Sequence, residues 1–236
     1  QNKTLEAIAQ TIFNEWFVHF NFPDENGKPY QATGGKMIVS ELGPIPEGWR
    51  VGDIYDIVIV DYGYPFSSNQ FNDKKVGLPL IRIRDLIDGE PEIYTDEICP
   101  DIYIVSSGDV LAGMDAEFRI VIWKGKKALL NQRLCRFRPK DNAGHTYAIE
   151  VIKPHLKFFE KTKFGTTVSH LNKRDLDSID IIVPPNKLIS AFSELTEPLY
   201  QKIILLNSQI QTLSNLRDEL LTKLIKGDIR VEEANE

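Results

Sequence analysis

The stretch Pro198–Lys226, PLYQKIILLNSQIQTLSNLRDELLTKLIK, has the most regular hydrophobic pattern of the 236-residue chain. Its apolar residues recur at spacings of three, four and seven, which is typical of a helix that packs along a partner helix. The residues of this stripe are Leu199, Ile203, Leu206, Ile210, Leu213, Leu220 and Leu224. Arg217 interrupts the stripe, and a second apolar row predicts contacts on more than one side of the helix. At ~1.5 Å per residue such a helix is ~43 Å long, which predicts a strut or spacer.

A weaker copy of this stripe opens the chain. A shift of 208 positions aligns the first helical segment with the last one, with three identities and five apolar-for-apolar matches. The aligned residues are Gln1, Thr4, Leu5, Ile8, Ile12, Phe13, Trp16 and Phe17 with Gln209, Thr212, Leu213, Leu216, Leu220, Leu221, Leu224 and Ile225. Two unrelated amphipathic helices give some matches by chance, but a repeat predicts that the chain begins inside a second spacer helix. The absence of an initiator Met is what we expect of a fragment.

Composition indicates an ordinary globular protein with 42% hydrophobic residues. We expect a cytoplasmic protein, because no apolar run approaches the ~18 residues of a membrane span and no signal peptide opens the chain. The two cysteines, Cys99 and Cys135, form no CxxC motif and lie near no histidine at ligand spacing. We therefore expect neither a disulfide framework nor a metal site, and the sequence indicates no cofactor.

The net charge of −6 hides a strong asymmetry. The segment Arg119–Lys140 holds eight basic residues and no acidic one, which leaves 20 basic and 34 acidic residues elsewhere. A basic face on an acidic body is typical of a protein that binds a polyanion at one site. The alternative is a solvated, Lys-rich hairpin.

The predicted fold class is α+β, with a mainly β domain and small helices flanked by long helices that form coiled coils. The predicted segments are an N-terminal spacer helix (1–22), a connector (23–48), the mainly β domain (49–185) and a C-terminal spacer helix (186–236). Predicted strands are Met37–Ser40, Ile54–Val60, Pro79–Arg84, Ile102–Val105, Phe118–Trp123, Arg133–Arg138 and Ile181–Val183. Helices are predicted at Thr4–Phe20, Thr146–Lys153, His155–Lys161 beyond Pro154, Lys173–Ser178 with Asn172 as N-cap, and Leu188–Leu195. We expect Pro198 to start or kink the long helix, within two residues of its position.

An enzyme needs a constellation of reactive groups, and the sequence offers none. The four histidines share no motif with a nucleophile, and neither a P-loop, a Rossmann glycine pattern nor a methyltransferase motif is present. Asp115 and Glu117 resemble a carboxylate pair, but such residues are far more often surface or hydrogen-bonding groups. The sequence therefore favours a binding protein.

Several stretches, in order along the chain, resemble the target recognition domain of the specificity subunits of type I restriction-modification enzymes. Those that resemble the opening of that domain are Gly48–Ile54, Gly63–Ser68 and Gly77–Leu86. Those that resemble its middle are Gly108–Leu111, Met114–Phe118 and Leu129–Leu134, and those that resemble its closing motif are Gly165–Leu171, Asp175–Leu176 and Ile181–Pro185. The terminal helices, Leu5–Gln10 and Leu220–Val231, resemble the family's conserved spacers. A full subunit has two recognition domains and two spacers, so this chain resembles a C-terminal half.

The resemblance implies a non-catalytic subunit that reads one half of a bipartite target in double-stranded DNA. It also implies docking of methyltransferase subunits, and of restriction subunits in the larger complex. Such recognition needs cations at phosphates and polar side chains at base edges. The candidates for DNA contact are Ser67, Asn69, Arg82, Arg84, Arg119, Lys124, Lys126, Lys127, Gln132, Arg133, Thr166, Thr167, Ser169 and His170.

Two further hypotheses remain open at this point. In the first, the chain is a protein-interaction adaptor that acts only through its helical stripe; in the second, it is a nuclease or methyltransferase acting alone. Because the N-terminal helix covers barely half of the long one, we also expect two copies to pair their long helices antiparallel in a homodimer.

Overall fold

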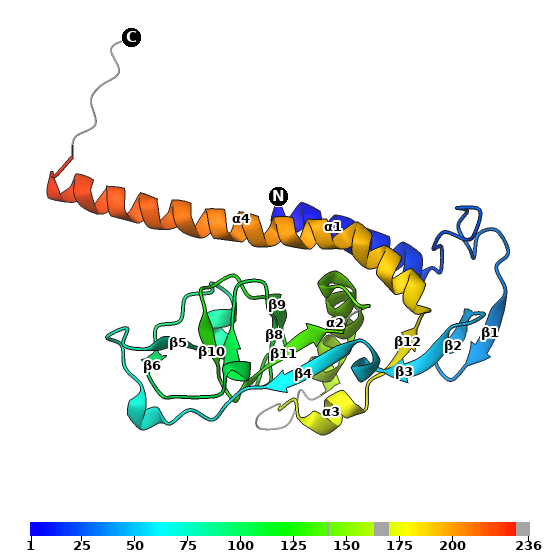
Figure 1. Ribbon diagram of the computed structural model, residues 1–236, viewed down its shortest axis with the longest axis horizontal. Coiled ribbons are helices and arrows are strands. Elements are labelled where there is room, and N and C mark those ends of the chain that lie inside the picture. The colour runs from blue at the N-terminus through cyan, green and yellow to red at the C-terminus, as the bar shows by residue number, and fades with distance from the viewer. Residues whose placement is uncertain (141, 163–169, 230–236) are drawn as a thin grey trace, which may run out of the picture.

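The computed structural model describes residues 1–140, 142–162 and 170–229, and every structural statement below concerns these residues. A mainly β domain lies beneath one long helix, α4, which extends well beyond it on one side (Figure 1). The shorter N-terminal helix α1 runs beside the proximal part of α4. The predicted α+β class, with a β domain and long flanking helices, is confirmed.

Two four-stranded sheets make up most of the domain. One is antiparallel throughout, in the order β4-β11-β8-β9; the other has the order β6-β5-β10-β7, with β10 parallel to β5. Two pairs, β1-β2 and β12-β3, lie outside them. The strands are β1 Met37–Ser40, β2 Gly43–Pro46, β3 Arg50–Asp53, β4 Val58–Tyr62, β5 Leu78–Ile81, β6 Tyr94–Thr95, β7 Ile104–Val105, β8 Val110–Gly113, β9 Ile120–Ile122, β10 Ala128–Leu130, β11 Leu134–Pro139 and β12 Asp180–Val183.

Three predicted strands are wrong at one end. In Ile102–Val105 the first two residues belong to the 3-10 turn Asp101–Tyr103, and only Ile104–Val105 form strand β7. In the other two, a side chain caps a helical turn. The segment Ile54–Val60 divides into a 3-10 turn, Ile54–Asp56, and strand β4, since Asp53 accepts a hydrogen bond from the Tyr55 N–H at 2.8 Å. Strand β5 ends at Ile81 instead of Arg84, since Asp85 accepts a hydrogen bond from the Arg82 N–H at 2.8 Å. An Asp near a strand end competes with the sheet for backbone donors.

The helices predicted on either side of Pro154 form one helix, α2 (His145–Thr162). Tyr147, Ile152 and Leu156 are all buried in the core, so packing along the whole helix outweighs the missing hydrogen bond at Pro154. The short helix α3 (Lys173–Asp177) is capped by Asn172 as predicted, with the Asn172 side chain accepting from the Asp175 N–H at 3.1 Å.

Helix α4 runs from Asn186 to Lys226 without a break, so it does not start at Pro198. Pro198 lies inside it, and the helix axis curves toward its N-terminal end (Figure 1). Helix α1 (Asn2–Phe13) continues into a π-helical turn over Asn14–Val18. The two helices are antiparallel, since Asn2 contacts Asn207 while Phe17 contacts Phe192.

One aromatic cluster joins both helices to the β domain. Phe17 lies 5.0 Å from Phe192 of α4, 4.9 Å from Tyr147 of α2 and 6.0 Å from Trp49, measured between ring centroids. All four side chains are buried. The N-terminal segment and the proximal part of α4 therefore belong to the domain's core, and they fix where the domain sits on the helix.

Candidate nucleic-acid interface

The side of the domain away from α4 gathers the polar connections between strands. Strand β8 pairs antiparallel with both β9 and β11, and Leu134 of β11 lies opposite Gly113 of β8. The β8–β9 connection (114–119) and the β10–β11 connection (131–133) therefore meet at one end of the sheets. Helix α3 lies on this same side in Figure 1. We call this end the reading end.

Asp115 is the anchor of the reading end. The Arg133 Nη1 donates to Asp115 Oδ2 at 2.5 Å, and the His170 ring contacts Asp115 Oδ1. Asp115 is only 9% exposed, whereas the side chains of Arg133 and His170 are 62% and 59% exposed. A buried carboxylate thus holds two exposed nitrogen-bearing side chains from separate segments in fixed positions. Such preorganised donors are suited to phosphates and base edges.

The backbone around Asp115 is held as firmly as its side chain. The Met114 N–H donates to the Arg133 carbonyl at 2.9 Å, and the Leu171 N–H donates to the Met114 carbonyl at 2.7 Å. Ala116, the next residue, has a φ of +59°, which is strained for a residue with a side chain. Asp115 and Glu117 pair with different arginines, since Glu117 contacts Arg119 at 3.3 Å while Asp115 contacts Arg133.

A second polar loop packs against the β10–β11 connection. The Gln132 N–H donates to the Tyr64 carbonyl at 3.0 Å, and a Cβ added at Gly63 would lie 1.9 Å from the Asn131 carbonyl oxygen. Only glycine allows this approach of two backbones. The loop leads to a 3-10 turn at Ser68–Gln70, so the exposed Ser67 and Asn69 follow closely on the segment that packs beside Gln132.

Two further arginines follow β5 toward the reading end. Because β5 is parallel to β10, with Ile81 opposite Leu130, Arg82 emerges beside the β10–β11 connection. Arg82 is largely engaged, since it pairs with Asp85 at 3.3 Å and with Glu92 at 3.7 Å. Arg84 is exposed.

The three candidate lysines lie at the opposite end of the sheets. Lys124, Lys126 and Lys127 occupy the β9–β10 connection, and a groove lined by Lys124 and Lys126 on one side is lined by α4 on the other. Nearby, the Gln211 side chain of α4 donates to Glu90 at 3.1 Å. The structure therefore places these lysines beside the long helix and apart from Asp115.

The interpretation of the eight basic residues as one basic face is wrong, because Lys124, Lys126 and Lys127 lie at the opposite end of the sheets from Arg133 and two others are paired inside the domain. Arg136 is 8% exposed and donates from Nη2 to Asp61 at 2.8 Å, and Arg138 donates from Nε to the same carboxylate at 2.6 Å. Burial alone would raise the pKa of Asp61, but the hydrogen bonds from Arg138 and Arg136 lower it below its ordinary value. Both arginines stabilise the sheet, and nothing in the sequence marks Asp61 as their partner.

Three candidates, Thr166, Thr167 and Ser169, lie outside the described residues. The sequence analysis missed the role of Asp115, which it considered only together with Glu117 as a carboxylate pair. Its role as an anchor depends on His170 and Arg133, which lie 55 and 18 positions away in the chain. No local sequence pattern reports such distant contacts.

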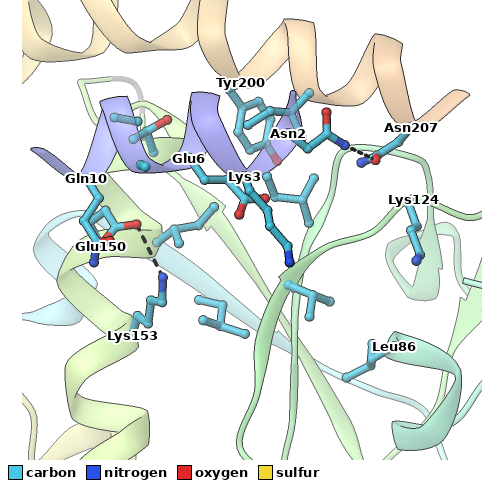
Figure 2. Close-up of a pocket in the computed structure, with 18 of the residues that line it drawn as sticks. Asn2, Lys3, Glu6, Gln10, Leu86, Lys124, Glu150, Lys153, Tyr200 and Asn207 are labelled. Carbon is cyan, nitrogen blue, oxygen red and sulfur yellow. Dashed lines mark hydrogen bonds and ion pairs between the residues drawn. The ribbon is translucent and has the colours of Figure 1, made fainter. Parts of the chain in front are cut away.

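A cleft of about 490 Å³ lies between α1, α2, β9 and α4 (Figure 2). Glu150 of α2 lines it, with Lys153 at 3.7 Å; burial and the nearby Glu6 raise the pKa of Glu150. Lys3 reaches into the space from α1 (Figure 2). No nucleophile paired with a base lines this cleft. Within the described ranges no group of three or more His, Cys, Asp or Glu side chains is arranged to hold a metal ion.

The stripe of α4 is divided into a covered and a bare part. Ile203 is buried and Leu199 and Leu206 are half-buried by the domain and α1. Ile210, Leu213, Leu220 and Leu224, which we call the bare stripe, are 36 to 64% exposed. No described helix is long and apolar enough to cross a membrane.

A β domain with anchored polar side chains at one end and a long helix with an exposed apolar stripe at the other has the architecture of a binding domain on a helical spacer. Comparison with known proteins gives the family. Residues 46–219 match the type I restriction modification DNA specificity domain, and the chain belongs to this family. The resemblance noted in the sequence is thereby confirmed.

Individual relatives agree. The chain is 29% identical over 247 residues to the type I restriction enzyme MjaIX specificity subunit of Methanocaldococcus jannaschii, covering 99% of this chain and 55% of that protein. It is 27% identical over 212 residues to the EcoBI specificity subunit of Escherichia coli, covering 86% and 45%. The chain thus spans about half the length of these curated relatives.

A chain in a solved structure concerned with complex assembly and conformational transition of the type I R-M system shares the fold. It superposes with a TM-score of 0.50 at 19% identity, covering 97% of this chain and 53% of that one.

Proposed function

We propose that this chain is a non-catalytic specificity subunit, or half of one, that reads one half of a bipartite target in double-stranded DNA. Residues 49–185 act as the reader and 186–236 as the spacer. Methyltransferase subunits dock along the helices, and restriction subunits join the larger assembly. Because the subunit acts on DNA, we also propose that it is located in the cytoplasm.

The observation that supports this proposal best is the pair of exposed side chains held by Asp115. The Arg133 guanidinium has five N–H donors, and the bond to Asp115 uses one of them, so the others remain directed elsewhere. A guanidinium with a fixed orientation can donate two bonds to the O6 and N7 of a guanine, the commonest specific contact in the major groove. Exposed Gln132 and Ser67 nearby add donors and acceptors of the kinds that read the remaining base edges.

The test is a selection of bound sequences from a random duplex pool, with methyltransferase subunits present, for the parent chain and for Arg133→Ala. We expect Arg133→Ala to relax the preference at one target position and to weaken binding of the preferred site by about 1 to 3 kcal/mol. Arg174→Ala is the matched control, because Arg174 is also exposed on this side of the domain but lies outside the Asp115 cluster. Equal effects of the two variants on affinity, with no change in preferred sequence, would refute the proposal.

The adaptor hypothesis is the second candidate, and the bare stripe favours it. Salt dependence separates the two functions, since phosphate contacts release counterions and make affinity fall steeply with salt. No duplex binding at a salt concentration of about 50 mM would favour the adaptor.

We also propose a two-fold homodimer through α4, which would place one reader at each end and make the combined target palindromic. The unsatisfied apolar surface of the bare stripe supports it, because each fully buried Leu or Ile contributes roughly 1.5 to 3 kcal/mol. Light scattering on a purified sample at tens of micromolar tests it. A single species near the chain mass of 26.9 kDa would rule the dimer out.

A further inference from the structure

The β8–β9 connection turns sharply at Ala116. The Glu117 N–H donates to the Asp115 carbonyl at 2.6 Å, and the Gly113 N–H closes the base of the loop by donating to the Arg119 carbonyl at 3.3 Å. Ala116 is exposed, whereas Asp115 beside it is buried. The connection therefore presents one small apolar side chain at the reading end, on a backbone whose two sides are tied together.

The backbone of Ala116 is strained, although its exposed methyl group adds little to the core. Three described residues other than glycine have a positive φ: Phe20, Lys75 and Ala116. Phe20 supplies a ring to the aromatic cluster, with its centroid 5.5 Å from that of Trp49. Ala116 has a φ of +59°, a conformation that glycine adopts without strain. A methyl group kept there at a cost in stability indicates a functional role, since strained residues cluster at binding and catalytic sites.

The side chain of Ala116 is unsuited to phosphates. Contact with a phosphate needs a cation or a hydrogen-bond donor, and a methyl group is neither. The flanking carboxylates are already engaged, Asp115 with Arg133 and Glu117 with Arg119. The partner of this methyl group must therefore be apolar. In the major groove, the apolar group that a base edge presents is the 5-methyl group of thymine.

The contact between Asp115 and Arg133 determines which base pair lies near this methyl group. Asp115 Oδ2 accepts from Arg133 Nη1 at 2.5 Å, and Ala116 directly follows Asp115 in the chain. Consecutive Cα atoms are ~3.8 Å apart, and consecutive base pairs are ~3.4 Å apart along a duplex. Because these two lengths are similar, Ala116 lies within reach of the base pair next to the one that Arg133 contacts.

We propose that the methyl group of Ala116 contacts the 5-methyl group of a thymine in the base pair next to the guanine that Arg133 reads. Cytosine lacks this methyl group, and the purines present polar atoms at their major-groove edges, so the contact selects thymine without a hydrogen bond. This inference rests on the proposed function, since it takes Arg133 as the reader of the neighbouring base. It assigns to the strained residue a cost in folding that is offset in recognition.

Two changes remove the two methyl groups separately: Ala116→Gly in the protein and deoxyuridine in place of thymine in the DNA. Duplexes are first selected from a random pool with methyltransferase subunits present. We expect Ala116→Gly to lose the preference for thymine at one position and to bind the selected target about fourfold more weakly, the value of one buried methyl group. Deoxyuridine should weaken the parent by the same factor and leave Ala116→Gly unaffected, as a double-mutant cycle measures.

Stability supplies an independent measurement and a matched control. We expect Ala116→Gly to raise the midpoint of urea unfolding, because glycine relieves the strain. Lys75→Gly is the control, since Lys75 has the same φ of +59° but lines the groove with Lys124 and Lys126 at the opposite end of the sheets. It should raise the midpoint as well and leave the selected sequence unchanged.

The outcomes separate this inference from the proposed function. A thymine beside the guanine, with a deoxyuridine effect in the parent that is absent in Ala116→Gly, supports the contact. A selected target without that thymine overturns the contact, and so does an unchanged preference in Ala116→Gly while Arg133→Ala still relaxes one position. If neither Ala116→Gly nor Arg133→Ala changes the selected sequence, both the contact and the reading role of Arg133 are overturned.

Discussion

Removing the carboxylate of Asp61 should cost this domain a large part of its stability. Asp61 is 7% exposed and accepts four hydrogen bonds from two arginines, at 3.0 and 2.8 Å from Arg136 and at 2.6 and 2.9 Å from Arg138. In Asp61→Ala, Arg136 keeps a 3.4 Å contact with Asp109 and the carbonyls of Ile102 and Ile104, so its charge is only partly compensated.

Breaking a buried ion pair by removing one partner costs about 3 to 5 kcal/mol. We expect the lower part of this range, since Arg138 is 42% exposed and can turn to solvent, whereas Arg136 cannot. Against a total stability of roughly 5 to 15 kcal/mol for a typical domain, this is a substantial fraction.

The assay is urea unfolding followed by circular dichroism and by tryptophan fluorescence, with equal slopes required for parent and variant. Glu47→Ala is the control, because the Lys36–Glu47 pair is exposed and should contribute little. A loss in Asp61→Ala no larger than in Glu47→Ala would refute the reasoning. If a stable Asp61→Ala instead showed an altered salt dependence of DNA binding, Arg136 and Arg138 would belong to the DNA contact after all.

Three other predictions follow from the same geometry. Hydrogen bonds hold the pKa of Asp61 below its ordinary value, so its contribution to the free energy of unfolding is complete above the unfolded pKa of about 3.9 and is lost as pH falls through the folded pKa. When the pH is lowered, the free energy of unfolding should therefore fall less for Asp61→Ala than for the parent. Lys126→Ala with Lys127→Ala should leave duplex affinity and its salt dependence, measured as log Kd against log salt, nearly unchanged, since both lysines lie at the end of the sheets opposite the reading end; a clearly flatter slope would show that the DNA backbone also contacts this end. Leu213→Asp should abolish association through the bare stripe and leave cooperative unfolding of the domain intact, with Thr222→Asp, exposed on the opposite side of the helix, as control; loss of the unfolding transition would show instead that the distal helix supports the core.

The sequence was most informative where a local residue type determines the backbone. Asn172 predicted the start of α3 correctly, and Pro184 and Pro185 marked the end of β12. It misled at Pro154, which remains inside α2 because buried residues on both sides hold the helix in place. At Pro198 only one of the two expected alternatives, a helix start, is wrong, since the residue lies inside the continuous helix α4. Proline lowers helix stability by a limited amount, which core packing exceeds here.

Two members of the candidate site were predictable from the sequence, but their arrangement was not. Arg133 and His170 were both identified as candidates, yet nothing local predicts that Asp115 brings them together. The run of basic residues in turn contains both solvated lysines and the buried Arg136, because charge is read from the chain while burial follows from strand pairing. Ion pairs between distant strands are a property of the topology.

The Tyr200 hydroxyl gives the long helix a mechanical role. It donates to the Gly108 carbonyl, and the neighbouring Asp109 contacts Arg136 in β11, the strand that directly follows Arg133. A chain of contacts thus connects α4 to the strand that leads from the reading end. If, as proposed, a partner subunit binds the free end of α4 and Arg133 reads the DNA, a force applied to the helix would reach Arg133 through Tyr200 and Arg136.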